Sequence, residues 1–172
     1  MAGQEAETVF EGDHLLVRES DGWQFVERKK GKEAVAVLAI ADDGVILTEQ
    51  FRNPLNARVI DYPAGLVGDE ESLTPSETAR KELEEETGYT CETVECVARG
   101  PNSPGITSEI VSFYRARGLR KTGAGGGVQG EDIKVHVVPL HDLEGWLRAK
   151  EREGLLLDLK LWGGLYFLQS HP

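Results

Sequence analysis

The sequence predicts an α+β or mixed α/β sandwich, with helices packed on a mixed β-sheet. Short apolar or alternating runs recur along the chain, one acidic helical pattern lies near the middle, and two helical patterns close it. Elements in this order usually pack as layers around one core. A chain of 172 residues with 40% hydrophobic side chains is large enough to bury such a core.

The N-terminal half is predicted to be mostly strand. A hairpin is expected over residues 14–27, because a Ser-Asp-Gly turn separates two alternating segments. The run 34–40 is almost wholly apolar, which is typical of a strand covered on both faces. An Asp-Asp-Gly turn precedes the strand expected at 45–51, and the strand pattern resumes at 59–62.

A break and then a helix follow these strands. The Pro-Ala-Gly sequence at 63–65 should interrupt regular structure and begin a loop that runs to about residue 74. Residues 76–87 have the composition of a helix, with Pro75 at its start and Gly88 as its stop.

The second half alternates strand and loop before it ends in helices. The glycine-rich run 122–130 is too flexible to form an element, and we expect a mobile loop. The predicted strands are 91–98, 110–116 and 133–138, and the predicted helices are 141–152 and 159–169.

Composition argues against several classes of partner. A net charge of -11 without a basic cluster would repel nucleic acid. No apolar run approaches the roughly 20 residues that cross a bilayer, and the N-terminus lacks signal-peptide features. We therefore expect a soluble cytoplasmic protein, in which Cys91 and Cys96 remain thiols.

Three acids share one face of the central helix. Glu82 lies three residues before Glu85 and four before Glu86, so the three carboxylates repel one another. Hard divalent cations such as Mg²⁺ or Mn²⁺ would relieve that repulsion and would also coordinate phosphate oxygens. A solvated surface helix is the alternative, and it would be the better interpretation of an acidic run taken alone.

The residues around this helix resemble the Nudix box. That motif has Gly, five residues, Glu, seven residues, and then Arg-Glu-apolar-any-Glu-Glu-any-Gly-apolar. Here Gly65 is followed after five residues by Glu71, and residues 81–89 fill the second half. Nine residues separate Glu71 from Lys81, and Lys81 replaces the arginine, with Arg80 beside it.

The resemblance extends beyond the box to the branch of ADP-ribose pyrophosphatases and GDP-mannose hydrolases. Similar segments are 49–52, 103–109, 124–135 and 154–168. Members of that branch are homodimers that often exchange N-terminal strands. The resemblance therefore implies a strand segment over residues 1–33, used for dimerisation and as a substrate lid, and a Nudix hydrolase domain over 34–172.

It also implies roles for individual residues. Glu85 would complete the metal shell or help to orient water. The metal ligands would be the Ala64 carbonyl, Glu82, Glu86 and Glu131. The substrate-binding residues would be Trp23, Arg28, Arg52, Gly65, Leu66 and Glu109.

The general base departs from the family pattern. Related enzymes place an acid two residues before the metal-binding Glu131, and here that position is Gln129. A neutral amide can orient water but cannot take its proton. The base could instead be Glu85, Glu131 or Asp132, and the sequence does not choose among them.

The implied activity is hydrolysis of the pyrophosphate bond of a nucleoside-diphosphate sugar, with Mg²⁺ as cofactor and Mn²⁺ as substitute. ADP-ribose would give AMP and ribose 5-phosphate. The alternatives are GDP-mannose or ADP-glucose as substrate, or a catalytically weak module that only binds nucleotide sugars.

Overall fold

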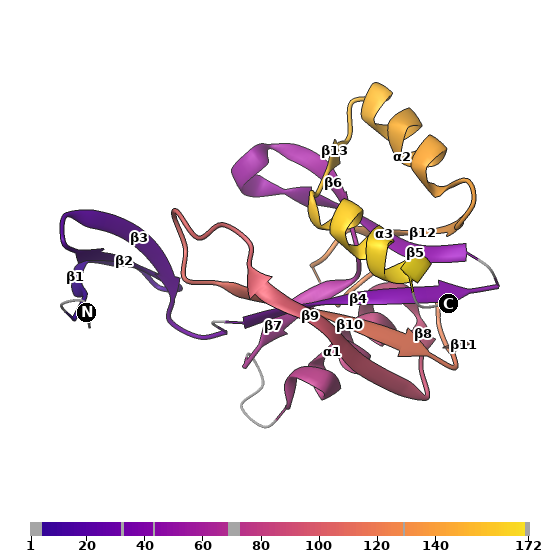
Figure 1. Ribbon diagram of the computed structural model, residues 1–172, viewed down its shortest axis with the longest axis horizontal. Helices are drawn as coiled ribbons and strands as arrows, with labels where there is room; N and C mark the ends of the chain where they lie inside the picture. The colour runs from indigo at the N-terminus through magenta and orange to yellow at the C-terminus, as the bar shows by residue number, and fades with distance from the viewer. Residues whose placement is uncertain (1–4, 32, 43, 69–72, 129, 171–172) are drawn as a thin grey trace.

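The computed structural model describes residues 5–31, 33–42, 44–68, 73–128 and 130–170. A mixed β-sheet lies at its centre (Figure 1). Helix α1 (Pro75–Thr87) covers one face of this sheet, and α2 (Leu143–Arg152) and α3 (Lys160–Ser170) lie on the other side. The predicted α+β sandwich is confirmed.

Eight strands form the central sheet. They are β4 (Glu33–Ala41), β5 (Gly44–Arg52), β6 (Ala57–Asp61), β7 (Ala64–Val67), β9 (Thr93–Pro101), β10 (Ile110–Arg117), β12 (Ile133–Pro139) and β13 (Leu156–Leu157). The order is β13-β6-β5-β4-β10-β9, with β12 paired to β5 and β7 paired to β4. β10 runs parallel to β4. A 3₁₀ turn, η1 (Asn53–Leu55), links β5 to β6, and β8 (Tyr89–Thr90) pairs with β11 (Arg120–Lys121).

Strand β4 explains why its sequence is apolar on both faces. Successive side chains of a strand point to opposite sides of the sheet. Val35 and Val37 pack toward α1, whereas Ala36 and Leu38 pack toward α2 and α3. Each face buries its own core, and the residues that the helices contribute are Ala79 and Leu83 on one side and Leu143, Leu147, Leu161 and Leu168 on the other.

The first three strands form a separate sheet that extends away from the rest of the molecule (Figure 1). They are β1 (Glu7–Glu11), β2 (Leu15–Ser20) and β3 (Trp23–Arg28). The predicted hairpin is confirmed as β2 and β3, with Asp21 and Gly22 at positive φ in its turn. The N–H of Val26 donates to the Ile106 carbonyl at 2.8 Å, which joins this sheet to the loop before β10.

The prediction of a loop directly after Pro63 is wrong, because residues 64–67 form strand β7. Pro63 follows the end of β6, and its carbonyl accepts a hydrogen bond from the Val37 N–H. Ala64–Val67 then pairs antiparallel with residues 33–36 of β4. This pairing is long-range, so local turn signals do not report it. Its consequence is functional, because β7 brings the start of the Nudix-box pattern next to α1.

Helix α1 begins and ends where the sequence predicts. Thr74 and Glu77 form a reciprocal capping box at its start, and Pro75 occupies the first turn. At the other end Gly88 adopts a left-handed conformation, and its N–H donates to the Glu84 carbonyl. These caps fix which residues face the sheet and which carry the acidic face.

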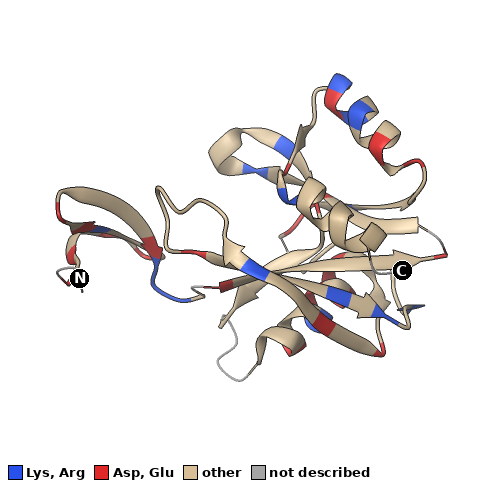
Figure 2. Cartoon of the chain, in the orientation of Figure 1, with Lys and Arg blue, Asp and Glu red and all other residues tan. Residues whose placement is uncertain are grey.

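Figure 2 shows charged residues on the N-terminal sheet, on strands of the central sheet and on α2, where both signs alternate. Cys91 and Cys96 are free thiols. Within the described ranges, no helix is both long and apolar enough to cross a membrane.

Candidate active site

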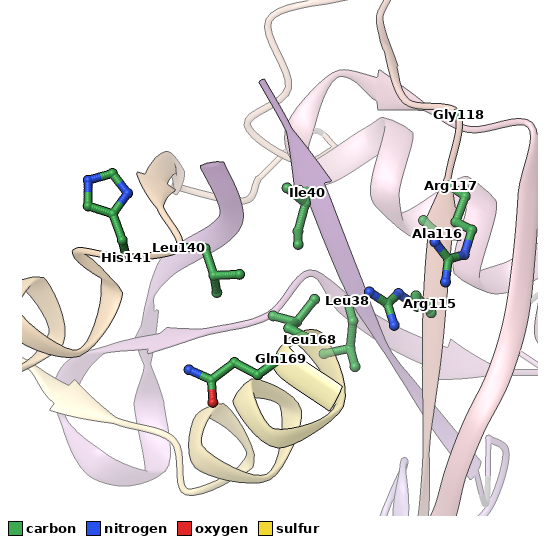
Figure 3. Close-up of a pocket in the computed structure, with 10 residues that line it drawn as sticks. All are labelled: Leu38, Ile40, Arg115, Ala116, Arg117, Gly118, Leu140, His141, Leu168 and Gln169. Atoms are coloured by element: carbon green, nitrogen blue, oxygen red, sulfur yellow. The ribbon is translucent and has the colours of Figure 1, made fainter. Parts of the chain in front are cut away.

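Two sizeable cavities lie along β4 and β10. The larger, of about 780 Å³, is at the C-terminal ends of these strands and contains none of the predicted site residues (Figure 3). The second, of about 520 Å³, lies near their N-terminal ends and is called the cleft below. Six predicted site residues line the cleft, namely Arg28, Arg52, Ala64, Gly65, Leu66 and Glu109. Its size suits a nucleotide-sized ligand.

Glu86 is the most buried acid of α1. Its carboxylate is beside β7, where Oε2 accepts a hydrogen bond from the Ala64 N–H at 3.0 Å. The residue is only 6% exposed, and burial raises its pKa to about 8. The Ala64 N–H opposes that shift, while Glu82 and Glu131 increase it and Arg52 reduces it. The structure therefore gathers Glu82 and Glu131 around Glu86, close to the cleft wall.

Two glycines make room for these acids. A Cβ at Gly65 would overlap the carboxylate of Glu82, so β7 can approach α1 only without a side chain there. A Cβ at Gly127 would overlap the carboxylate of Glu131, and Gly127 also has a φ of 84°. The Nudix-box glycine thus has a steric role beside the acidic helix.

The glycine-rich segment runs along the C-terminal end of α1. The N–H groups of Gly126 and Gly127 donate to the carbonyls of Glu86 and Glu85 at 2.8 and 3.0 Å. Glu131 then folds back, and its Oε2 accepts from the Val128 N–H at 2.9 Å. The expected mobile loop is therefore hydrogen-bonded to α1 over its described residues. Gln129 lies outside the described residues, as does Glu71.

A smaller cavity of about 190 Å³ lies on the α1 side of β7. Glu82, Glu85 and Glu131 line it together with Lys81, and Leu66 lines both this cavity and the cleft. Lys81 Nζ is 2.5 Å from Glu85 Oε2. Arg80, by contrast, donates to the carbonyls of Cys91 and Glu92 and so ties α1 to the start of β9.

The acidic cluster of Glu82, Glu85, Glu86 and Glu131 has the chemistry of a divalent-cation site. Glu82 and Glu131 repel the buried carboxylate of Glu86. Carboxylate oxygens are the hard ligands that Mg²⁺ prefers. Within the described residues, no three acidic, His or Cys side chains already form a metal-binding group. Glu131 is turned toward its own loop and Glu85 toward Lys81, so both would have to reorient to join Glu82 and Glu86.

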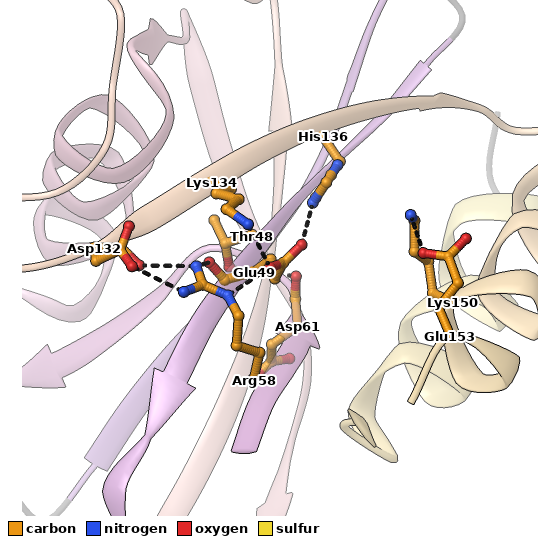
Figure 4. A network of polar contacts seen from close by, with 9 residues as sticks. All are labelled: Thr48, Glu49, Arg58, Asp61, Asp132, Lys134, His136, Lys150 and Glu153. Atoms are coloured by element: carbon orange, nitrogen blue, oxygen red, sulfur yellow. Dashed lines mark hydrogen bonds and ion pairs between the residues drawn. The ribbon is translucent and has the colours of Figure 1, made fainter. Parts of the chain in front are cut away.

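The base of the glycine-rich segment is anchored by an ionic network on β5, β6 and β12 (Figure 4). Arg58 donates to Asp132 Oδ2 at 2.8 Å and to Glu49 Oε1 at 2.5 Å. Glu49 also accepts from Lys134 at 3.2 Å and lies 3.0 Å from His136 Nε2. Burial acts to raise the pKa of Glu49, but these hydrogen bonds outweigh burial and lower it.

The N-terminal sheet supplies one predicted residue to the cleft and leaves another outside it. Arg28 Nε is 2.8 Å from Glu109 Oε2, so two predicted substrate contacts are paired with each other. Trp23 does not line the cleft. It is 63% exposed, and its Nε1 donates to the Gly105 carbonyl at 3.3 Å.

Three charged residues of the cleft were not predicted as site residues. Lys160 Nζ lies 2.9 Å from Asp61 and 2.5 Å from Asp158, and all three line the cleft. Burial raises the pKa of Asp61 to about 6, although the Lys160 ammonium opposes that shift. No sequence motif connects these residues, because Asp61 at the end of β6 and Lys160 at the start of α3 are far apart in the chain. The only sequence feature that could have indicated this group was a lone acid, Asp61, at the end of an apolar strand.

Comparison with known proteins agrees with this geometry. A family profile described as the NUDIX domain matches residues 30–157, which include β4 to β13 and α1. The chain belongs to the Nudix family. It is a Nudix pyrophosphohydrolase, and nucleotide-sugar pyrophosphatases are among its relatives.

Individual Nudix relatives cover different shares of the chain. A methanol dehydrogenase activator from Bacillus methanolicus is 37% identical over 79% of this chain and 71% of its own length. An ADP-ribose pyrophosphatase from Bacillus subtilis is 44% identical over 50% of this chain and 46% of its own length. A GDP-mannose pyrophosphatase from Cronobacter sakazakii is 35% identical over 67% of this chain and 61% of its own length. The chain thus spans less than two thirds of the length of each of these two pyrophosphatases.

The fold has a counterpart among solved structures. A structure described as an ADP compounds hydrolase superposes with a TM-score of 0.67, at 21% identity, over 84% of this chain and 82% of that one. At this identity the match establishes a shared fold.

Proposed function

We propose that the protein hydrolyses the pyrophosphate bond of a nucleoside-diphosphate sugar in a Mg²⁺-dependent reaction, with ADP-ribose as the preferred substrate. The observation that carries this proposal is the position of β7. Gly65 and Leu66 line the cleft on one side of this strand, while Glu82 and Glu86 lie against it from α1. A diphosphate bound along β7 would sit beside the acids.

The metal ligands in this proposal are Glu82, Glu86, Glu131 and the Ala64 carbonyl, with Glu85 completing the shell or orienting water. Mg²⁺, or Mn²⁺ in its place, would screen the charge of the diphosphate and lower the pKa of a bound water. The chain needs such screening because its acids alone would repel the substrate. Glu86 is buried and has Glu82 and Glu131 near it, which supports this assignment.

The remaining cleft residues bind and orient the substrate. Arg52 lines the cleft and provides positive charge near Glu86, which supports a role for it in contacting a phosphate. Gly65 and Leu66 allow the diphosphate to approach the backbone of β7. In this proposal Glu109 accepts hydrogen bonds from a ribose, and Arg28, its ion-pair partner, fixes its orientation.

The reaction is an in-line attack of water on one phosphorus, which breaks the P–O–P bridge and releases AMP and ribose 5-phosphate. Because Gln129 cannot accept the proton of water, a carboxylate must. Hydrogen bonding to Arg58 lowers the pKa of Asp132 and makes it a weak base. We therefore assign the base to Glu85 or Glu131, which both line the smaller cavity with Glu82.

The proposal is tested by turnover with and without Mg²⁺. We expect phosphate release, after coupling to a phosphatase, from ADP-ribose with Mg²⁺ and its loss with EDTA. Glu82→Gln should remove turnover without unfolding the protein, whereas Glu144→Gln, a matched change at an exposed acid of α2, should leave it unchanged. Full activity of the Glu82 variant would overturn the metal assignment.

GDP-mannose is the second candidate substrate, because a GDP-mannose pyrophosphatase is among the relatives. The same assay with ADP-ribose, ADP-glucose and GDP-mannose decides by comparing kcat/KM values. Binding of ADP-ribose without turnover, not restored by Gln129→Glu, would instead identify a binding module.

A further inference from the structure

The larger cavity lies at the far end of the strands that line the cleft. Ala34 and Ala36 line the cleft, and Leu38 and Ile40, on the same face of β4, line the cavity. Between them lies a partly buried aromatic contact, where Phe113 of β10 packs against the rings of Tyr62 and Phe167. The cavity is therefore a separate space from the cleft.

Four large apolar side chains form part of its wall, and the polar residues of the lining are Arg115, Arg117, His141 and Gln169. Figure 3 shows Leu38 and Ile40 on β4, Leu140 before α2, and Leu168 near the end of α3, arranged around the space. At about 780 Å³, the cavity falls within the range of small-molecule sites in proteins. The apolar part of this wall favours a ligand with an apolar body.

Two arginines line the same cavity from β10. Arg115 and Arg117 are two positions apart and thus on one face of the strand, and both are drawn in Figure 3. Arg115 is only 6% exposed. Its Nη1 donates to the neutral carbonyl of Phe167 at 3.3 Å, which uses one of its five donors. Among the residues described, no acidic side chain lines the cavity.

The charges around Arg115 leave it incompletely compensated. Burial and the neighbouring Arg117 lower the pKa of Arg115, and Glu95, its cross-strand partner on β9, offsets these effects only in part. A buried guanidinium without a paired carboxylate is costly unless an anion meets it. The remainder of this chain is strongly acidic, so a cavity lined by arginine and free of acids is a local exception.

We propose that this cavity binds a small organic anion whose apolar body fills the space between Leu38 and Leu168. Its carboxylate, sulfonate or phosphate group meets Arg115 and Arg117. The site is independent of the hydrolase reaction, because none of its residues lines the cleft.

The test uses two dyes with the same ring system. 8-Anilinonaphthalene-1-sulfonate carries the anion, and N-phenyl-1-naphthylamine lacks it. Fluorescence titration should show that Arg117→Gln weakens binding of the sulfonate about tenfold, as expected for one lost charge-assisted hydrogen bond, and leaves binding of the neutral dye unchanged. Arg152→Gln, which removes the same charge from exposed α2, should change neither affinity.

Further arms distinguish this cavity from other apolar surfaces. Octanoate should displace the sulfonate dye and octanol should not, whereas ADP-ribose should leave the dye bound. Arg117 is used because the buried Arg115 contributes to packing, and thermal melts of each variant verify folding. Equal affinity of the sulfonate dye for the Arg117 and Arg152 variants, or its displacement by ADP-ribose, would overturn the proposal.

Discussion

Glu86 shows how one residue connects stability to the proposed metal site. Its carboxylate is buried beside β7 with two other acids nearby, so its pKa of about 8 lies well above the ordinary glutamate value of 4.5. Between these two pH values the folded protein binds more protons at this residue than the unfolded chain does. Stability contributed by Glu86 is therefore complete below pH 4.5 and is lost as pH rises toward 8.

In EDTA, Glu86→Gln should stabilise the protein at pH 8.5 relative to the unsubstituted chain, by roughly 1 to 4 kcal/mol. The advantage should be smaller at pH 5, where the carboxyl of Glu86 is largely protonated in the folded protein. Urea unfolding at the two pH values measures both differences. A difference that does not vary with pH would show that Glu86 is not held in a desolvated position.

Gly65 provides a second prediction at this scale. Gly65→Ala should reduce turnover at least about tenfold, because the new Cβ displaces the Glu82 carboxylate and a misplaced functional group loses that much rate. Steady-state kinetics with ADP-ribose and circular dichroism measure the two effects separately. Gly145→Ala on α2 is the control, since a Cβ there meets nothing within 4 Å. Equal kinetics for the two variants would contradict the steric role of Gly65.

At the scale of elements, the position of Glu131 depends on β5, β6 and β12. Glu131 is one residue from Asp132, and Arg58 on β6 contacts both the side chain and the carbonyl of Asp132. The other end of the segment is bonded to the C-terminal carbonyls of α1. Two elements far apart in sequence thus fix the segment that carries one proposed metal ligand.

Arg58→Met should weaken Mn²⁺ affinity about tenfold, because Glu131 loses its anchor while Glu49 keeps Lys134 and His136. Titration calorimetry with Mn²⁺ measures the loss, and Arg58→Lys should recover part of it. Arg148→Met, which breaks an exposed ion pair with Glu151, is the control. A purely structural role would lower the melting temperature and leave Mn²⁺ affinity intact.

At the scale of the whole molecule, the N-terminal sheet lacks a core of its own. Phe10 is 62% exposed and Trp23 is 63% exposed, and the strand register places them on opposite faces of the sheet. A small sheet whose large apolar side chains are unpacked gains little stability by itself. We propose that residues 1–33 are a dimerisation segment and substrate lid, and that a second copy covers these exposed side chains next to the hydrolase domain, 34–172.

Sedimentation velocity should therefore detect a homodimer. Phe10→Asp together with Trp23→Asp should shift it toward monomer, because the charges would be buried at the interface. Leu159→Asp, at a residue 80% exposed near α3, should not change the sedimentation coefficient. A monomer at all concentrations would contradict the proposal.

Features that depend on interactions between residues near in sequence were predicted correctly, and features that depend on distant residues were not. Helix α1 was predictable from end to end, because its capping Thr74, Pro75 and Gly88 act within a few residues of their partners. The strands with continuous or alternating patterns, such as β4, were predictable for the same reason. Strand β7 was not, since its partner β4 lies some 30 residues earlier in the chain.

The sequence by itself determined the family, the α+β layers and the clustering of Glu82, Glu85 and Glu86 on one helical face, because spacing along a helix or strand decides these. Only the tertiary structure decided that β7 lies between these acids and the cleft, that Trp23 stands outside the cleft, and that Asp61, Asp158 and Lys160 join its wall. Such contacts depend on how distant strands pair and helices pack, and no local pattern encodes the resulting distances.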